Sequence, residues 1–477
     1  MSIQLNDLHL LKTQAYINGQ WLEADNGATF AVRNPANGEV IAEIANLGAA
    51  ETRIAIEAAE AARPDWQSRP ALERSAILQA WHDLILQHQD DLAMLMTLEQ
   101  GKVLAESQAE VAYGASFIKW FAEEARRVYG DVIPAPQNDR RALVIKQPVG
   151  VAAAITPWNF PQAMIARKAG PALAVGCTMV IKPAQETPLS ALAMAELAHR
   201  AGVPPGVLNI VPGTDARAIG AELTGNPLVK KLSFTGSTPV GKVLMQQCAT
   251  TVKRTSMELG GNAPVIVFAD ADIKQAVAGA AASKYRNAGQ TCICANRILV
   301  QDAVYDDFVE QFCELVASYR LGDGLDPNST HGPLVNNAAV DSVDALVQEA
   351  VQQGATARLG GGPDTQGGCF YQPTVLTNVT DQMRVFREEI FGPVAPIFRF
   401  STETEAIAMA NDTEFGLAAY CYTRDIGRVW RVSGALEYGM VGMNEVAITA
   451  DSVPFGGVKE SGQGREGSRY GLDDYLE

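Results

Sequence analysis

The spacing of apolar positions changes near residue 143 of the chain. Before it, apolar residues recur every three or four positions and predict helices over residues 49–62, 73–101 and 106–127. The second of these ends at Gly101, a typical helix stop. A short strand-like pair is predicted around AYINGQWLEA and TFAVRNPANGEVIAEI, because NG and NPANG are turn signals.

From Leu143 the apolar residues occur in short uninterrupted runs. These are VIKQPVGVAAAITP, CTMVIKP, VLNIVPG, KLSFTG and APVIVF, and helical patterns over residues 164–175, 189–201, 215–224 and 240–248 accompany them. Continuous apolar strands that alternate with helices predict a buried parallel sheet. Right-handed crossovers place the loops that follow the strands along one edge, where ligands of such sheets bind.

A second α/β series follows the segment ELGGN. Its strands are predicted in RILVQ, ATARLGG, QPTVLTNV and PVAPIFRF, and its helices over residues 305–319, 340–353 and 404–410. We expect a separate sheet here. The chain has 477 residues, which is too long for one compact core and agrees with two or three domains.

Composition narrows the class of protein. The formal net charge of −16 opposes binding to nucleic acid or to an anionic membrane. No apolar run approaches the ~18 residues of a membrane span, and MSIQLNDLHLLKTQ lacks the features of a signal peptide. The seven scattered cysteines are typical of thiols in a reducing compartment. We therefore expect a cytoplasmic protein with no membrane or nucleic-acid partner.

Two strand ends carry residues suited to a phosphate or a ribose. In SFTGSTPVGK, Gly236 allows a close backbone approach, while Ser237 and Pro239 begin a helix whose free N–H groups attract an anion. In VIKPAQETP, Lys182 ends a predicted strand at the same edge. Taken singly, each segment is equally compatible with an ordinary strand–helix turn or an exposed lysine.

Two other segments carry candidate catalytic groups. In ITPWNFP, two prolines stiffen the turn around Trp158 and Asn159, so the asparagine amide is a candidate oxyanion donor. In MELGGN, Glu258 lies between the two α/β series and is a candidate general base. Turn chemistry and a solvated glutamate are the alternatives.

The segment RNAGQTCICANR places Cys292 and Cys294 one residue apart, with no histidine nearby. Only one thiol is needed for nucleophilic catalysis. Cys294 is then either a small apolar filler or a redox partner of Cys292. No second Cys or His pair at zinc spacing accompanies them, so we expect no metal.

Together, these motifs resemble the aldehyde dehydrogenase superfamily over about residues 15–477. PWNFP, KPAQETP, FTGSTPVG, ELGGN, GQTC, EEIFGP and PFGGVKESGQGRE carry the resemblance. RNAGQTCICANR, ALEYGMVGMNE and GREGSRYGLDDYLE are similar to its NADP-dependent succinate-semialdehyde dehydrogenase branch.

The resemblance implies an α/β fold with two Rossmann-like parallel-sheet domains and a small oligomerisation hairpin. The dinucleotide-binding domain is expected over residues 1–127 and 147–258, and the catalytic domain over residues 259–474. Residues 128–146 and 475–477 are expected to form the oligomerisation element of a homotetramer or dimer.

The resemblance also assigns roles to single residues. Cys292 is the nucleophile that forms a thiohemiacetal and then a thioester, and Glu258 is the base that activates water. The Asn159 side chain and the backbone N–H of Cys292 are expected to bind the oxyanion. The expected cofactor-binding residues are Trp158, Lys182, Gln185, Gly236, Ser237, Leu259, Glu389 and Phe391.

Substrate and cofactor choice follow from a few positions in the same resemblance. Arg167 and Arg286 match carboxylate-binding arginines, and Thr449 stands where the branch uses a serine. Succinate semialdehyde is the expected substrate, and glutarate semialdehyde or another carboxylated aldehyde is the alternative. Gln185 replaces a glutamate common in NAD-preferring relatives, so we expect NADP, with NAD also accepted.

The sequence also allows a regulatory disulfide and two rival functions. A reversible disulfide between Cys292 and Cys294 occurs in some members of the branch and is the redox reading of the pair. A CoA-acylating dehydrogenase is a rival, although such enzymes do not need the Glu258 base. A non-catalytic binding protein is a second rival, and intact Cys292, Glu258 and Asn159 argue against it.

Overall fold

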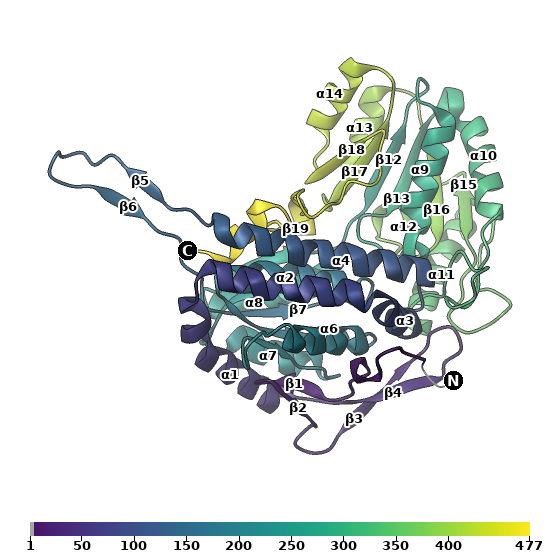
Figure 1. Ribbon diagram of the computed structural model, residues 1–477. Helices are drawn as coiled ribbons and strands as arrows, with labels where there is room; N and C mark the ends of the chain where they lie inside the picture. Colours follow the sequence, from purple (N-terminus) through teal and green to yellow (C-terminus); the bar gives the residue numbers. More distant parts are fainter. Residues whose placement is uncertain (1–3) are drawn as a thin grey trace.

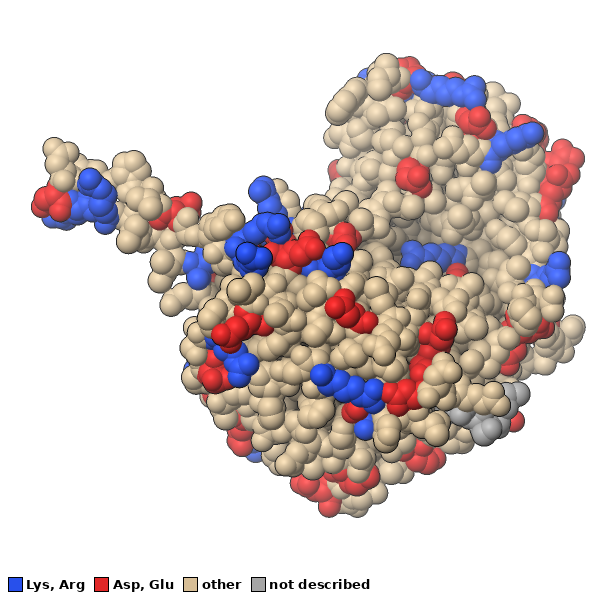
Figure 2. All heavy atoms as spheres, in the orientation of Figure 1, with Lys and Arg blue, Asp and Glu red and all other residues tan. Residues whose placement is uncertain are grey.

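Two separate sheets organise the computed structural model, which describes residues 4–477. Residues 1–3, with which the first predicted domain and the segment MSIQLNDLHLLKTQ begin, lie outside the described residues. Figure 1 shows two lobes, one for each sheet, and a hairpin that projects from the body. Figure 2 shows a hollow between the lobes on the same face, with charges of both signs scattered around it.

The first sheet has the strand order β19-β11-β10-β7-β8-β9-β1-β2. Neighbouring strands from β11 to β9 are parallel, as the continuous apolar runs predict, while both edges add antiparallel strands. The strands are β1 (Ala15–Ile17), β2 (Gln20–Leu22), β7 (Val151–Ile155), β8 (Thr178–Lys182), β9 (Leu208–Ile210), β10 (Val229–Thr235), β11 (Arg254–Glu258) and β19 (Gly462–Gln463).

Helices cover both faces of this sheet, because successive residues of a buried strand point to opposite sides. Residues Ala152 and Ala154 of β7 pack in the cluster that contains α2, α4, α5 and α6. Val151 and Ala153 pack on the other side, with α1, α7 and α8. The helices are α1 (Ala49–Ser68), α2 (Ala71–Gln87), α3 (Gln89–Gln100), α4 (Leu104–Glu124), α5 (Pro161–Val175), α6 (Pro188–Arg200), α7 (Ala216–Gly225) and α8 (Thr238–Cys248).

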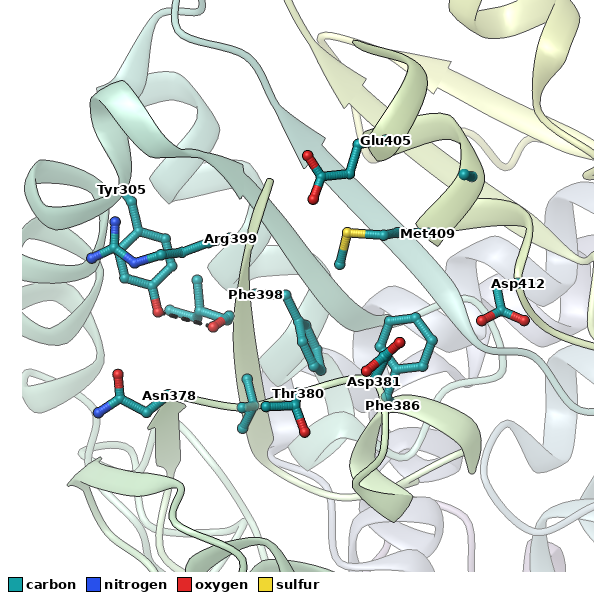
Figure 3. Close-up of a pocket in the computed structure, with 13 residues that line it drawn as sticks. Tyr305, Asn378, Thr380, Asp381, Phe386, Phe398, Arg399, Glu405, Met409 and Asp412 are labelled. Carbon is teal, nitrogen blue, oxygen red and sulfur yellow. Dashed lines mark hydrogen bonds between the residues drawn. The ribbon is translucent and has the colours of Figure 1, made fainter. Parts of the chain in front are cut away.

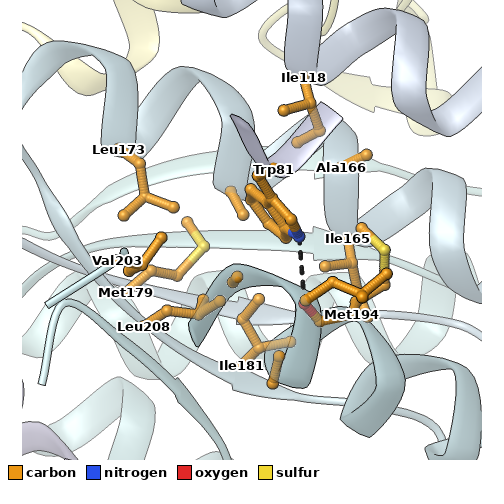
Figure 4. Packing of buried hydrophobic residues seen from close by; sticks show 14 of the residues in the cluster. Trp81, Ile118, Ile165, Ala166, Leu173, Met179, Ile181, Met194, Val203 and Leu208 are labelled. Atoms are coloured by element: carbon orange, nitrogen blue, oxygen red, sulfur yellow. Dashed lines mark hydrogen bonds between the residues drawn. The ribbon is translucent and has the colours of Figure 1, made fainter. Parts of the chain in front are cut away.

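Trp81 of α2 stands at the centre of the larger cluster (Figure 4). Its indole Nε1 donates a hydrogen bond of 3.1 Å to the carbonyl oxygen of Met194 in α6, so even this buried polar atom has a partner. Ile118 of α4, Ile165 of α5 and Met179 of β8 belong to the same cluster. The outer helices α2 and α4 are thereby fixed to the sheet.

One helix prediction is wrong in its extent. The pattern over residues 73–101 predicts a single helix, whereas α2 and α3 are separate and His88 lies between them with φ −106° and ψ 23°. The apolar spacing continues through this break, so the sequence pattern does not reveal it. Gly101 does end α3, in the left-handed conformation with φ +97°.

The second sheet has the order β14-β15-β16-β13-β12-β17-β18. Its strands are β12 (Ala263–Val267), β13 (Ala295–Gln301), β14 (Thr356–Leu359), β15 (Thr374–Thr377), β16 (Val394–Phe400), β17 (Ala418–Tyr422) and β18 (Met440–Met443). Its helices are α9 (Ile273–Tyr285), α10 (Tyr305–Ala317), α11 (Asn337–Gln352), α12 (Arg384–Arg387), α13 (Glu403–Asn411) and α14 (Ile426–Ala435).

APVIVF corrects the sequence interpretation. The sequence pattern groups this run with the first series, but it forms β12 and pairs with β13 and β17 of the second sheet. The preceding segment RTSME forms β11 and takes the place beside β10. β12 is fully buried and β11 is partly buried, and the sequence does not say which sheet receives each one.

The projecting hairpin consists of β5 (Asp131–Ile133) and β6 (Ala142–Val144), which pair antiparallel. A second two-stranded sheet joins β3 (Thr29–Arg33) and β4 (Val40–Ala45). The C-terminus lies beside the base of the projecting hairpin (Figure 1), where the backbones of Gln147 and Glu477 exchange hydrogen bonds of 2.7 and 2.8 Å. Among the helices of residues 4–477, none combines the length and the apolar character needed to cross a bilayer.

Candidate active site

A cavity of about 310 Å³ lies where strand ends of the first sheet meet loops of the second. Strands β7, β10 and β11 run into it, because the carboxyl ends of parallel strands share one edge. The second sheet contributes the turn before β13 and the loop before β16. Predicted site residues that line the cavity are Trp158, Asn159, Gly236, Ser237, Glu258, Leu259, Cys292, Glu389 and Phe391.

A larger hollow of about 560 Å³ lies elsewhere, among β16, α12, α13 and the segment that follows β15 (Figure 3). Arg399 and Glu405 border it, and Phe386 and Phe398 form part of its wall. None of the predicted site residues is among its lining residues. Volume alone therefore does not identify the active site, whereas the smaller cavity joins a thiol, a carboxyl and an amide.

The turn that carries Cys292 follows α9 and has an unusual backbone. Asn287 and Ala288 adopt left-handed φ values of 50° and 53°, and Gly289 follows with φ 77°. The Gln290 side chain holds this turn by donating to the Asn287 carbonyl at 3.1 Å and accepting from the Val335 N–H at 2.9 Å. Such strained backbone persists only where its surroundings fix it, and here it presents Cys292 to the cavity.

Gly261 lets the ELGGN segment pass close to this turn. A Cβ atom at position 261 would lie 2.3 Å from the carbonyl oxygen of Cys292, a distance that excludes any side chain. The Gly261 N–H also donates to Glu389 at 3.0 Å. The boundary between the two sheets is thus packed tightly around the nucleophile.

Asn159 follows β7 and is buried at the cavity wall. Its side-chain Nδ2 donates to the carbonyl oxygen of Gln290 at 3.0 Å, which leaves its second N–H for another acceptor. The backbone N–H of Cys292 forms no hydrogen bond within the described part of the chain. Both donors predicted for an oxyanion are therefore present, and that role stays a prediction.

Glu258, the last residue of β11, is buried and its Oε2 has no hydrogen-bond partner among the described residues. Burial raises its pKa well above the ordinary value, and the nearby charge of Glu466 raises it further. Arg167 and Lys168 act in the opposite direction. When the pKa of a carboxyl group is raised, its ionised form accepts a proton more readily. This property suits a general base that works near neutral pH.

The Cys292 side chain is less buried than that of Glu258, but the pKa of its thiol is also raised. Burial raises the pKa of its thiol to about 12, and Glu389 contributes to the increase. The thiol is thus protonated at neutral pH and needs a base at the moment of attack. Glu258 borders the same cavity.

The predicted substrate residues lie outside the lining of the cavity. Arg167, in α5, is buried, with its guanidinium 3.8 Å from the Phe455 ring centre and its Nε 2.8 Å from Glu466. Arg286 is exposed and lies over the ring of Phe160, which lines the cavity, at 4.9 Å. Thr449 is half-buried in the segment between β18 and β19.

The cofactor residues divide into two groups. Trp158 and Phe391 meet edge to face, 5.5 Å between ring centres, and Phe391 has a positive φ of 52°. Lys182 and Gln185 do not line the cavity. The Lys182 Nζ is buried and donates to the Pro183 carbonyl at 3.1 Å, and Gln185 is exposed.

The start of α8 fits a bound phosphate. Ser237 is the N-cap residue, as predicted, but its hydroxyl makes no capping hydrogen bond, and Pro stands in the first turn. The exposed hydroxyl and the unpaired N–H groups therefore face a ligand rather than the helix. This arrangement suits the pyrophosphate of a dinucleotide at the carboxyl edge of the sheet.

Cys294 is buried beside the site without lining the cavity. Its Sγ lies 3.4 Å from the carbonyl oxygen of Gly289 and 3.6 Å from the Nζ of Lys284. Within residues 4–477, no cluster of three or more His, Cys, Asp or Glu side chains is arranged to hold a metal ion.

Several charged residues at the site escaped the sequence analysis. Glu106 accepts the Asn287 N–H at 2.8 Å, and Lys102 and Glu110 form a buried ion pair behind Asn159. In the sequence they resemble ordinary charges in a helical region. They lie in a helix-rich segment without a recognisable motif, so the sequence does not mark them as site residues.

Comparison with known proteins agrees with this geometry. The chain is 59% identical over 475 residues to succinate-semialdehyde dehydrogenase [NADP(+)] GabD of Escherichia coli, covering 100% of this chain and 98% of the relative. It is 60% identical over 475 residues to a glutarate-semialdehyde dehydrogenase of Pseudomonas putida, with the same coverage.

Solved structures agree as well. The crystal structure of an E. coli NADP-dependent enzyme matches with a TM-score of 0.99 at 59% identity, covering 99% of this chain and 98% of that chain. A model of the aldehyde dehydrogenase family matches residues 21–477. By these matches, and with the two-sheet α/β fold, the chain belongs to the aldehyde dehydrogenase family.

Proposed function

We propose that the chain oxidises succinate semialdehyde to succinate with NADP, or with NAD, as the electron acceptor. The observation that carries this proposal is the cavity in which Cys292, Glu258 and Asn159 converge. The relatives named for succinate and glutarate semialdehydes support the substrate class. Glutarate semialdehyde is the second candidate, because one methylene changes binding in a pocket by only about 1–3 kcal/mol.

The first chemical step joins the Cys292 sulfur to the aldehyde carbon. The thiol proton passes to Glu258, and the carbonyl π electrons move to oxygen. The resulting oxyanion accepts hydrogen bonds from the Asn159 side chain and the Cys292 backbone N–H. A thiohemiacetal attached to Cys292 is the product of this step.

Oxidation requires a hydride acceptor, which a bound nicotinamide supplies. Ser237 and the start of α8 would hold its phosphates, Lys182 and Glu389 would hold its riboses, and Trp158 and Leu259 would line the groove. After oxidation, Cys292 carries a thioester. Glu258 first releases to solvent the proton that it took from the thiol. It then takes a proton from a water molecule, the hydroxide attacks the thioester carbon, and the carboxylic acid leaves while Glu258 returns this proton to the sulfur.

We propose that two arginines bind the distal carboxylate of the substrate. A guanidinium binds a carboxylate with two parallel hydrogen bonds, which gives both charge and orientation. Arg167 stacks on Phe455, and Arg286 stacks on Phe160 at the cavity. Thr449 supplies a hydroxyl from the segment before β19.

We also propose a homo-oligomer, a dimer or a tetramer, built in part by the projecting hairpin. Val132 and Leu143 in this hairpin are each 71% exposed, which is costly for apolar side chains in a monomer. Light scattering of the purified protein measures the assembly. A monomer at micromolar concentration would contradict this proposal.

One set of assays tests the function. We expect kcat/KM for succinate semialdehyde to exceed that for uncharged hexanal, and NADP to be used better than NAD. Glutarate semialdehyde is measured in parallel to rank the two acids. A preference for hexanal would overturn the arginine assignment, and a strict need for CoA would indicate the acylating reaction instead.

A further inference from the structure

Lys102 and Glu110 form a fully buried ion pair next to the active site. Lys102 follows Gly101 at the end of α3, and Glu110 lies in the first half of α4. The Lys102 Nζ is 2.5 Å from Glu110 Oε2, and both side chains have 0% exposure. The proposed reaction assigns neither residue a chemical role.

The same ammonium group holds the peptide that carries the oxyanion amide. Lys102 Nζ donates to the backbone carbonyl of Asn159 at 2.7 Å and lies 4.1 Å from the ring centre of Phe160. The carbonyl that follows the Asn159 side chain is thereby fixed in direction. Asn287 donates to this same carbonyl from its Nδ2 at 3.1 Å.

The second oxygen of Glu110 holds the helix that begins just after Asn159. Glu110 Oε1 accepts from the backbone N–H groups of Gln162 and Ala163 at 3.0 and 3.2 Å. Helix α5 has no side-chain cap of its own, since its N-cap residue is Phe160. One carboxylate from α4 therefore replaces the missing cap and fixes the start of α5.

A buried ion pair is weak evidence for stability, because an apolar pair of similar volume is often as stable or more so. What distinguishes this pair is where its two charged groups bind. Lys102 holds the Asn159 carbonyl, and Glu110 holds the start of α5. From these contacts we propose that Lys102 and Glu110 are positioning residues that set the Asn159 amide for oxyanion binding. The inference rests on the proposed function only where Asn159 is taken as the oxyanion donor.

The double variant Lys102→Met with Glu110→Gln tests the pair without leaving an unpaired buried charge. A misplacement of about 1 Å at a catalytic group can cost about a hundredfold in rate. We expect kcat to fall about 10- to 100-fold, with KM for the aldehyde changed less than about threefold. If this variant does not fold, Lys102→Gln with Glu110→Gln serves with the same expected fall in kcat, since both side chains stay polar and no buried charge is left unpaired.

Glu99→Gln is a matched control. Glu99 is a buried carboxyl in α3 that accepts the backbone N–H groups of Leu189 and Ser190 at 2.7 and 2.8 Å, and so caps α6 as Glu110 caps α5. Neither of these hydrogen bonds of Glu99 reaches the Asn159 loop. We expect Glu99→Gln to keep kcat within about twofold of the wild type.

A double-mutant cycle with Asn159→Ala provides the sharper test. If the pair acts through Asn159, its replacement causes no further loss of kcat in the Asn159→Ala background. Equal losses in both backgrounds, or a loss matched by Glu99→Gln, would overturn the proposal. The cycle works with any aldehyde that the wild type oxidises, so it stays informative even if the preferred substrate is not succinate semialdehyde.

Discussion

The Nε of Arg167 lies 2.8 Å from the carboxylate of Glu466, and both side chains are almost completely buried. The same carboxylate contacts the Nζ of Lys168. Glu466 also raises the pKa of Glu258, while Arg167 lowers it. Arg167, which we propose to bind the substrate carboxylate, therefore belongs to the same network of buried charges as Glu258, the proposed base.

Replacing Arg167 should change selectivity more than overall activity. We expect Arg167→Gln to lower kcat/KM for succinate semialdehyde about 10- to 100-fold, as for loss of a charged hydrogen bond, and to lower it less for uncharged butanal. Steady-state kinetics with both aldehydes give the ratio.

Arg74→Gln is the matched control, because Arg74 is buried, donates to the Ala174 carbonyl at 3.0 Å and does not line the cavity. It should leave the ratio of the two kcat/KM values unchanged. Equal losses for both aldehydes in Arg167→Gln would contradict a role in carboxylate binding.

The pKa of Glu258 links stability to pH. Burial raises this pKa in the folded state, so the folded protein binds the proton more tightly than the unfolded chain. The resulting stabilisation is complete below the unfolded pKa and is lost as pH rises through the folded pKa. We expect the Tm of Glu258→Gln, minus that of the wild type, to become more positive between pH 5 and pH 9, as measured by calorimetry. A constant difference would show that Glu258 titrates as an ordinary glutamate.

Mild peroxide should inactivate the enzyme, and a thiol reductant should restore it. One peroxide removes two hydrogens from Cys292 and Cys294, forming the S–S bond and two waters, and the small ring makes this disulfide easy to reduce. Residual activity after peroxide and after reductant measures the effect. Unchanged sensitivity and recovery in Cys294→Ala would exclude the disulfide, leaving Cys294 as a buried filler next to Lys284.

Gln185→Glu should shift cofactor preference toward NAD. A carboxylate accepts ribose hydroxyls but repels the 2′-phosphate of NADP, and Gln185 is exposed, so the substitution disturbs little packing. The ratio of kcat/KM with NADP to that with NAD should fall about tenfold. A ratio that stays constant would place the 2′-phosphate away from this residue.

Local sequence pattern predicts β7, β8 and β10 and the edge where the site lies, but it does not predict β11, β17 or β18. The runs that form β7 and β8 are mostly apolar, and β10 carries the apolar residues Leu232 and Phe234. Asn159, Lys182 and Gly236 lie at or just after the ends of these strands. Periodicity describes one segment at a time, however. It did not reveal the break at His88 or the membership of β12 in the second sheet.

The sequence does not predict which charged residues from distant segments come together in the fold. Lys102 meets Asn159, and Arg167 meets Glu466, only because the fold brings distant segments together. The motifs identified Asn159 and Arg167 through resemblance, but no local pattern marks the partners that hold them. The residue roles remain predictions that the experiments above test.

The central claim is that the sulfur of Cys292 carries the acyl group. Mass spectrometry of protein quenched during turnover of succinate semialdehyde with NADP tests it most directly. We predict an added succinyl mass on the peptide that contains Cys292, and loss of both adduct and turnover in Cys292→Ala. Full-rate oxidation by Cys292→Ala, or an adduct on another residue, would contradict the account.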